Sequence, residues 1–455
     1  MRSIRLESLE GSVFARKQRP ATDADAGPLQ GNFLIAVDDG RHSSAEDQRA
    51  LQAILPENAR CTLRDSSAVK ARELGSVQFV LALFADASTM DRLADAVQQA
   101  REAGAHTTLI LAVQPSALAA LGRWLSQRAE SERLVGARLM VASSISEVIE
   151  QLPKRLIPVQ ECNVIRMPQS TEIENAPKSS FFTFSPQIQD LIRRIRAFAD
   201  NGITRAYLLG GPGSGKTSLA YYYYLSRRKG RFVSVNLLAE DTGDKSAVKS
   251  LLCGHVPGAF PGAGARAGAF DIAQDGVCFL DESHGVMGAV METLMEALDN
   301  GQYMPYGAAA KRPLKCALIF ATNRSWEHLL SSVNIDEFTR LGAATLQVPE
   351  LCEREEDLIA VAATTLARLA APCTTWEPPT GVDPAAWHRI RSCRWHGNVR
   401  ALIRTLEAAF VETTTGATSR SDLIDDVAID RGIALWEPTE HHSHAIYASS
   451  VDSSP

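Results

Sequence analysis

The sequence lacks three features that would each fix a class of protein at once: a CxxC pair, a long apolar run and an excess of basic residues. Its 8 cysteines stand singly, which favours buried thiols in a reducing compartment over a zinc site or a disulfide framework. No apolar run approaches the roughly 18 residues of a membrane helix, and the N-terminus has no signal-peptide core. These absences predict a cytoplasmic protein without a membrane partner.

The charge balance is slightly acidic, with 47 Lys+Arg against 53 Asp+Glu and a formal net charge of -6. A chain whose main work is coating nucleic acid would usually be basic. The length of 455 residues predicts two or three domains. Shifts in composition divide the chain into a flexible leader (1–30), an α/β domain (31–153), a linker (154–180), a second α/β unit (181–348), a helical unit (349–412) and a mostly unstructured tail (413–455).

Five apolar stretches alternate with helical patterns in the first α/β domain. The stretches are 33–39, 61–65, 77–84, 107–115 and 138–144. Such alternation predicts a parallel sheet covered by helices on both faces.

The most specific motif is GGPGSGKT at Gly210–Thr217, between an apolar strand (206–209) and a helical run. This context predicts a phosphate-binding loop, in which backbone N–H groups and a helix N-terminus face the phosphates. Lys216 is expected to reach the β- and γ-phosphates of ATP, and Thr217 to hold Mg²⁺. The predicted nucleotide-binding residues of this segment are Gly210, Gly211, Gly213, Ser214, Gly215, Lys216, Thr217 and Ser218.

Two further apolar strands end in polar residues. The segment GVCFLDES places Asp281 and Glu282 at a strand end, where Asp281 would complete the Mg²⁺ site and Glu282 would orient the attacking water. The strand 317–323 ends in Asn323, which could sense the γ-phosphate. Ligands of open α/β sheets bind beyond the carboxyl ends of the strands, so these residues are expected to lie together.

Together these motifs resemble the AAA+ ATPases, and in particular the central domain of sigma-54-dependent transcription activators. The resemblance covers about Phe181 to Ala409. Its most specific part is GAFPGA, similar to the GAFTGA signature of that family's client-binding surface loop. The predicted client loop therefore consists of Gly258, Ala259, Phe260, Pro261, Gly262 and Ala263.

The resemblance implies roles for three more residues. Asn236 matches the switch asparagine that pairs with the catalytic glutamate, Arg400 in WHGNVRAL matches a sensor arginine, and Arg340 matches an arginine acting on the neighbouring subunit. It also implies an AAA+ core (181–348) with a helical lid (349–412), and a ring, expected to be a hexamer. The sequence departs from the family at Pro261, where the family has its main sigma-contacting threonine, and at Asn334, a usual arginine position.

The first α/β domain resembles a flavodoxin-like receiver domain, with Asp38 and Asp39 at the end of its first strand. The position of the phosphate-accepting aspartate falls at about Leu83, and the nearest acid is Asp86. This departure predicts a degenerate receiver that is not phosphorylated in the usual way. A different Rossmann-like sensor for a small ligand or a protein fits the same pattern.

Beyond Phe410 the sequence shows no pair of amphipathic helices with a short turn, so direct sequence-specific DNA binding is not expected. Three functions remain open. The first is an ATP-driven motor that remodels the complex of sigma-54 with RNA polymerase. The second is a repurposed remodelling ATPase with another client. The third is a nucleotide-gated co-regulator that assembles with a complete activator.

Overall fold

The structure is a computed structural model that describes residues 31–40, 42–131, 134, 136–168, 178–237, 245–283, 289–324, 344–373, 376–415 and 422–437. The predicted leader, 1–30, lies outside these residues. Within them, no helix is both long and apolar enough to cross a membrane.

The N-terminal domain contains a five-stranded parallel sheet with the strand order β2-β1-β3-β4-β5. Its strands are β1 (Gly31–Val37), β2 (Ala59–Arg64), β3 (Phe79–Leu83), β4 (Thr108–Val113) and β5 (Ala137–Val141). This is the flavodoxin-like order, which confirms the predicted fold of the domain. The three central strands β1, β3 and β4 are almost wholly apolar, as strands buried on both faces are.

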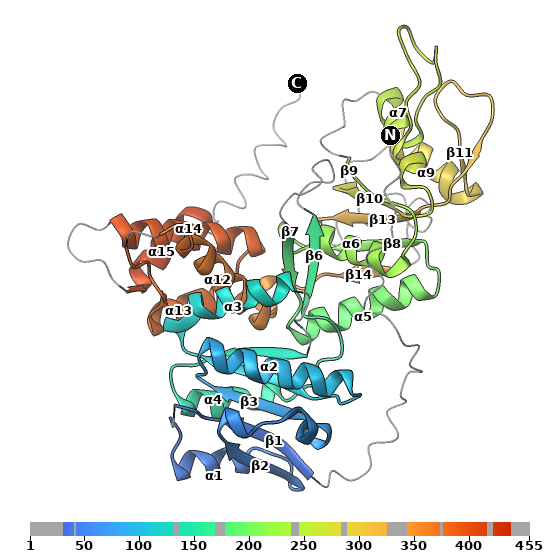
Figure 1. The fold of residues 1–455 in the computed structure, drawn as a ribbon. Helices are drawn as coiled ribbons and strands as arrows, with labels where there is room; N and C mark the ends of the chain where they lie inside the picture. Colours follow the sequence, from blue (N-terminus) through green and yellow to red (C-terminus); the bar gives the residue numbers. More distant parts are fainter. Residues whose placement is uncertain are drawn as a thin grey trace.

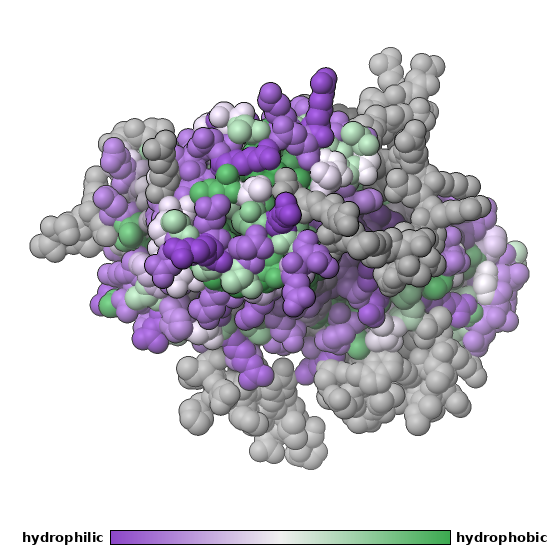
Figure 2. All heavy atoms as spheres, turned by 90° about the horizontal axis from the view of Figure 1, so that it is seen from below, coloured by the Kyte–Doolittle hydropathy of each residue, from purple (hydrophilic) through white to green (hydrophobic). Residues whose placement is uncertain are grey.

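Four helices pack around this sheet: α1 (Ala45–Ala53), α2 (Ala87–Glu102), α3 (Leu118–Glu130) and α4 (Ile145–Gln151). Helix α2 begins after Asp86, whose side chain accepts a hydrogen bond from the Thr89 backbone N–H at 2.8 Å. Seen from the side of this domain, the surface is mainly hydrophilic with smaller apolar areas (Figure 2).

The predicted linker contains regular structure. Strand β6 (Val164–Pro168) pairs antiparallel with β7 (Lys178–Phe182), so the expectation of an unpatterned segment is wrong for these residues. Strand β6 is short, and Ile165 is one of its buried residues. Its stability depends on pairing with a partner strand, a contact that its own periodicity does not reveal.

The second sheet, that of the predicted AAA+ core, is also parallel and has the order β14-β8-β13-β10-β9. Its strands are β8 (Arg205–Leu209), β9 (Phe232–Asn236), β10 (Val277–Asp281), β13 (Ala317–Thr322) and β14 (Thr345–Gln347). The accompanying helices are α5 (Pro186–Asp200), α6 (Lys216–Arg227), α7 (Lys245–Cys253), α8 (Ala269–Ala273) and α9 (Ala289–Asn300). A small antiparallel pair, β11 (Gln302–Tyr303) with β12 (Arg312–Pro313), follows α9.

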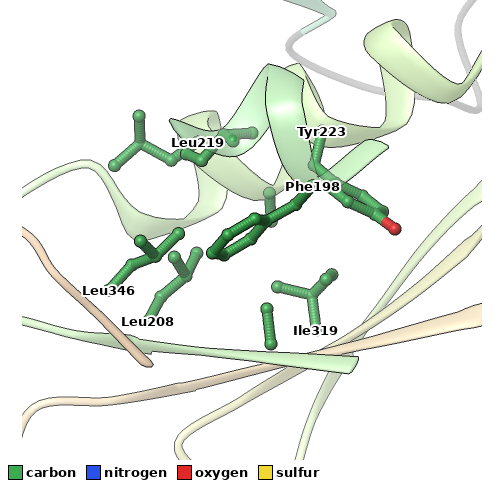
Figure 3. A pocket seen from close by; sticks show the side chains of 9 residues that line it. Phe198, Leu208, Leu219, Tyr223, Ile319 and Leu346 are labelled. Carbon is green, nitrogen blue, oxygen red and sulfur yellow. The ribbon is translucent and has the colours of Figure 1, made fainter. Parts of the chain in front are cut away.

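An apolar pocket lies between helices α5 and α6 and the sheet of the core (Figure 3). Side chains from both helices and from the sheet line it, among them Phe198, Leu208, Leu219 and Ile319. The Tyr223 hydroxyl points out of the pocket and donates to the backbone oxygen of Ile203. With this lining the pocket is part of the packing that seats α6 on the sheet, and it offers no group to a polar ligand.

The lid consists of α12 (Glu355–Ala370), α13 (Pro384–Ser392), α14 (Asn398–Thr415) and α15 (Asp426–Trp436), with a two-stranded pair of β15 (Gly381–Val382) and β16 (Leu423–Ile424). Within the predicted tail from residue 413, residues 422–437 thus contain regular structure. Helix α15 buries Ala428, Ile429 and Gly432, with Gly432 close to Thr405 of α14. Its apolar face is short, and it is stabilised by packing against α14.

The N-terminal domain packs directly on the lid, with α3 lying beside α12 (Figure 1). Buried side chains of both helices, including Leu121 and Leu366, belong to one continuous hydrophobic core. The helices approach most closely at Gly122, where an added Cβ atom would lie 1.9 Å from the Ala363 carbonyl oxygen. A glycine is therefore required at this crossing.

We predict that Gly122→Ala lowers the free energy of unfolding of the full chain by about 1–3 kcal/mol, as overpacking of a core does. Alanine is the better helix former, so the loss must come from the contact with α12. Thermal unfolding of the variant should be compared with that of Gln127→Ala, on the exposed face of α3. Equal melting temperatures for these two variants would contradict the observed packing.

Candidate nucleotide site and client loop

The loop between β8 and α6 has the backbone of a phosphate cradle. Gly215, directly before α6, has φ +104°, a value that side-chain-bearing residues rarely adopt. A Cβ atom there would also lie 2.1 Å from the Phe181 ring. The backbone N–H groups at the start of α6 lie at the positive end of the helix dipole, which favours a bound anion.

Lys216 is the first residue of α6, and its side chain turns back over the loop. Its ammonium group donates to the carbonyl oxygens of Gly210 at 2.8 Å and Gly211 at 3.0 Å. Burial lowers the pKa of Lys216, while the carboxylates of Asp281 and Glu282 oppose that shift. The lysine and the two acids predicted from separate motifs therefore share one electrostatic site.

The acid pair lies at the carboxyl end of β10. Glu282 has φ +52°, an uncommon conformation for this residue type, and its N–H donates to the Asp281 carboxylate at 3.0 Å. Ser283 fixes the turn, because its hydroxyl donates to the Ala321 carbonyl at 2.9 Å and also bonds the Tyr207 hydroxyl. Burial and the adjacent Asp281 raise the pKa of Glu282, and the opposing influence of Lys216 is smaller.

The predicted polar residues of the neighbouring strands end at the same edge. Asn236 is the last residue of β9 and pairs in register with Asp281. Asn323 directly follows β13, which lies between β8 and β10 in the sheet. The structure thus brings Lys216, Asp281, Asn236 and Asn323 to the carboxyl edge of one sheet. Arg340 and Asn334 lie outside the described residues.

Two buried side chains at the lid, Asn398 and Arg354, form hydrogen bonds with the phosphate loop. Asn398 donates to the Pro212 carbonyl at 3.2 Å and accepts from the Leu351 N–H at 2.8 Å. Arg354 donates to the Ser214 carbonyl at 3.1 Å. Neither residue was predicted from the sequence to have a role, although Asn398 stands in the motif that contains Arg400. Their hydrogen bonds join segments that are far apart in the sequence.

Arg400, the predicted sensor arginine, also lies beside the loop. A Cβ atom added at Gly213 would be 3.2 Å from the Arg400 Cγ atom. The positive charge of Arg400 contributes to lowering the pKa of Lys216. The lid therefore adds a cation to the phosphate side of the site.

The predicted client loop forms a compact hairpin between α7 and α8. His255 pairs antiparallel with Arg266, and the Gly258 N–H donates to the Ala263 carbonyl at 3.0 Å. At the tip, the Ala263 N–H donates to the Phe260 carbonyl at 2.9 Å, and Gly262 has φ +81°. This is the geometry of a type II turn, which favours proline at its second position, where Pro261 stands.

A second hairpin, formed by β11, β12 and the residues between them (302–313), supports the client loop and was not predicted from the sequence. The Val256 N–H donates to the Tyr306 carbonyl at 3.1 Å, and the rings of Phe260 and Tyr306 are 6.3 Å apart. Both hairpins project from the same end of the core (Figure 1). The second one follows a two-residue strand, too short to give a periodic signal. Phe260 remains 43% exposed and is available for contact.

The carboxylates of Asp38 and Asp39 in the N-terminal domain accept hydrogen bonds from neighbouring residues of the same domain. Asp38 is 5% exposed and accepts hydrogen bonds from the N–H groups of His42 at 2.9 Å and Ser43 at 2.7 Å. Burial acts to raise the pKa of Asp38, but these bonds and that of the Ser43 hydroxyl outweigh it, so its pKa is lowered. Asp39 accepts from the Ser66 N–H at 2.7 Å and the Thr89 hydroxyl at 2.9 Å.

The position expected for a phosphate-accepting aspartate carries no acid in the folded domain. Leu83 ends β3 with 1% of its surface exposed. The nearest acid, Asp86, caps α2. Among the described residues, no group of three His, Cys, Asp or Glu side chains is placed to hold a metal ion. That the domain is a degenerate receiver remains a prediction.

A five-stranded parallel sheet with a phosphate loop after β8, an acid pair after β10 and a helical lid defines the ATPase module of the AAA+ class. Residues 181–347 match the family of the sigma-54 interaction domain. This core therefore belongs to the AAA+ ATPases of the sigma-54-dependent transcription activators.

Two curated relatives agree with this assignment. Nitric oxide reductase transcription regulator NorR2 of Cupriavidus necator is 32% identical over 277 residues, which are 58% of this chain and 51% of that protein. The transcriptional regulator NtrC of Azospirillum brasilense is 29% identical over 286 residues, 60% of this chain and 58% of that protein. The chain thus spans only about half the length of these relatives.

A crystal structure of NtrX from Brucella abortus aligns over 91% of this chain and 88% of its own, with a TM-score of 0.48 and 17% identity.

We predict that Asn398→Ala lowers the free energy of unfolding by about 1–3 kcal/mol, because the buried Leu351 N–H loses its acceptor. Chemical unfolding measures the change. Asn201→Ala, at an exposed helix end, is the control and should change stability by less than about 0.5 kcal/mol. Similar losses in both variants would show that Asn398 does not join the lid to the phosphate loop.

Proposed function

We propose that this chain is an ATP-hydrolysing motor of the sigma-54 activator type. It would use ATP to move the loop Gly258–Ala263 and so remodel the complex of sigma-54 with RNA polymerase. The observation that carries the proposal is the meeting of Lys216 and the pair Asp281 and Glu282 at one sheet edge, with the client loop joined to the strand of that pair through α8. The family of the core supports the same function.

The described residues fit a magnesium nucleotide. The start of α6 offers backbone donors to the phosphates, and Lys216 offers a positive charge that neutralises phosphate oxygens. The Thr217 hydroxyl and the Asp281 carboxylate are oxygen donors, the type that Mg²⁺ requires. Magnesium would neutralise negative charge on the phosphate oxygens.

Glu282 is assigned to orient the water that attacks the γ-phosphate, so that ATP and water give ADP and phosphate. Asn236, next to Asp281 in the sheet, would hold Glu282 between cycles, and Asn323 would sense the γ-phosphate. Arg400 would bind the phosphates from the lid. In a ring, proposed to be a hexamer, Arg340 of one subunit would act on the nucleotide of its neighbour.

Coupling to the client loop would run through α8 and β10. Helix α8 follows the loop, and β10 follows α8 and ends in Asp281. Asp271 in α8 accepts hydrogen bonds from the Tyr303 hydroxyl at 2.7 Å and from Arg312 at 2.8 Å. A shift of β10 on hydrolysis would therefore move both hairpins together.

We predict that Glu282→Gln binds ATP with an affinity close to that of the parent but hydrolyses it at least about 10²-fold more slowly, because the water-orienting carboxylate is lost. Nucleotide binding and steady-state phosphate release measure the two effects separately. Glu296→Gln, which removes a surface carboxylate paired with Lys311, is the control. Hydrolysis by Glu282→Gln at the parent's rate would remove Glu282 from the mechanism.

A second candidate function, remodelling of a client other than sigma-54, is favoured by Pro261. Proline has neither the hydroxyl nor the N–H of the threonine that stands there in the family signature. The type II turn around it holds the tip in one shape. Such a tip presents the Phe260 side chain and the pyrrolidine ring of Pro261, which suits an apolar contact on a client.

We predict that Pro261→Thr increases the retention of sigma-54 about three- to tenfold, the value of one added hydrogen bond, while ATP turnover stays unchanged. Retention is measured in pull-downs with the protein trapped by ADP and a metal fluoride. Ala309→Ser, in the second hairpin, serves as a control for an added hydroxyl. Absence of sigma-54 from both the parent and Pro261→Thr, with turnover intact, would assign the motor to another client.

A further inference from the structure

Four consecutive charged residues at the start of α12 connect three parts of the protein. Arg354 donates to the phosphate loop, at the Ser214 carbonyl. Asp357 accepts from the Phe184 N–H at 2.6 Å, where the core begins. Between them, Glu356 forms an ion pair with Arg138 of the N-terminal domain, and Glu355 forms one with Arg155, directly after that domain.

The pair of Arg138 and Glu356 is fully buried. Its N–O distance is 2.5 Å, and each side chain is 1% exposed. The second oxygen of Glu356 accepts from the Leu139 N–H at 3.1 Å. Arg138 also donates to the Ile157 carbonyl at 3.0 Å. The two domains also share a continuous hydrophobic core around this pair, so separating them would expose apolar side chains to water, which makes this contact unsuited to repeated opening.

The same contacts cover the edge of the N-terminal sheet. Strand β5 is an edge strand, and its outward backbone groups need partners. Glu356 accepts from the Leu139 N–H, and Arg155 donates to the Leu139 carbonyl at 3.1 Å. Arg155 in turn pairs with Glu355 at 2.6 Å. The lid therefore completes the hydrogen bonding of a strand that belongs to another domain.

Arg354, which donates to the Ser214 carbonyl of the phosphate loop, lies two residues before Glu356 in the chain. Arg354 is 1% exposed, and its guanidinium lies 5.9 Å above the centre of the Phe181 ring. That ring occupies the space beside Gly215. A displacement of Glu356 would move the start of α12, and with it the guanidinium that holds the Ser214 carbonyl.

We propose that the N-terminal domain is a fixed support for the nucleotide site of its own chain, and that Arg138 is a positioning residue for the phosphate loop. Arg138 acts through Glu356 and the start of α12, and it touches no nucleotide itself. This inference rests on the proposed function, in that the loop binds ATP. It assigns the domain a role that requires no phosphorylation and no release from the lid.

The test compares Arg138→Met with Arg128→Met in the full chain. Arg128 is also a buried arginine of the N-terminal domain, but it pairs with Asp91 and Asp95 of the same domain. Arg138→Met is expected to raise the Kd and the KM for ATP about tenfold, with kcat changed less than about twofold, because the loop is displaced while the reacting groups remain. Arg128→Met is expected to lower the melting temperature with KM unchanged.

A rescue variant separates domain docking from the loss of a charge. In Arg138→Met/Glu356→Gln no carboxylate lacks its counter-charge, and the amide oxygen still accepts from the Leu139 N–H. This double variant is expected to regain most of the ATP affinity. If it docks normally but binds ATP as weakly as Arg138→Met, the positioning role is wrong.

Gly122→Ala provides the same test should Arg138→Met fail to fold, because it disturbs the contact of α3 with α12 without burying a charge. It is expected to raise the KM for ATP severalfold relative to Gln127→Ala. A KM equal to the parent's in Arg138→Met, or in Gly122→Ala where that variant is needed, would overturn the proposal. A parent protein that does not bind ATP would instead overturn the proposed function.

Discussion

The first turn of α12 is the point on which the arrangement of the three domains depends. Three charged side chains are removed from water in this turn or directly before it, and each must find its partner in a different part of the chain, since an unpaired buried charge is very costly. Arg354 finds it at Ser214, Asp357 at Phe184 and Glu356 at Arg138. The phosphate loop, the core and the N-terminal domain are thereby held in one geometry.

The chemistry of the site follows from a simpler constraint, the direction of parallel strands. All five strands of the core run the same way, so their carboxyl ends form one edge, and polar residues that leave the strands must gather there. Asp281, Asn236 and Asn323 reach this edge from three strands. The lid adds Arg400 from outside the sheet, beside the phosphate loop.

Local patterns in the sequence were sufficient to predict both sheets, the phosphate loop and the acid pair, because buried strands and glycine-rich turns are encoded by adjacent residues. The β6–β7 ribbon and the second hairpin were missed, since their stability comes from partners distant in sequence. The same holds for Arg138, which is separated from Glu356 by 218 residues. The roles of the site residues remain predictions, and Arg340 lies outside the described residues.

The N-terminal domain illustrates how a fold can keep its architecture while its acids change their use. In this chain Asp38, Asp39 and Asp86 hold the surrounding loops and helix ends, so an added phosphate or metal would have to displace existing hydrogen bonds. A receiver that signals by changing its contacts needs an interface of small free energy, whereas this domain shares a core and a buried ion pair with the lid. The proposed role as a fixed support agrees with both observations, because a support needs neither a free acid for phosphorylation nor release from the lid.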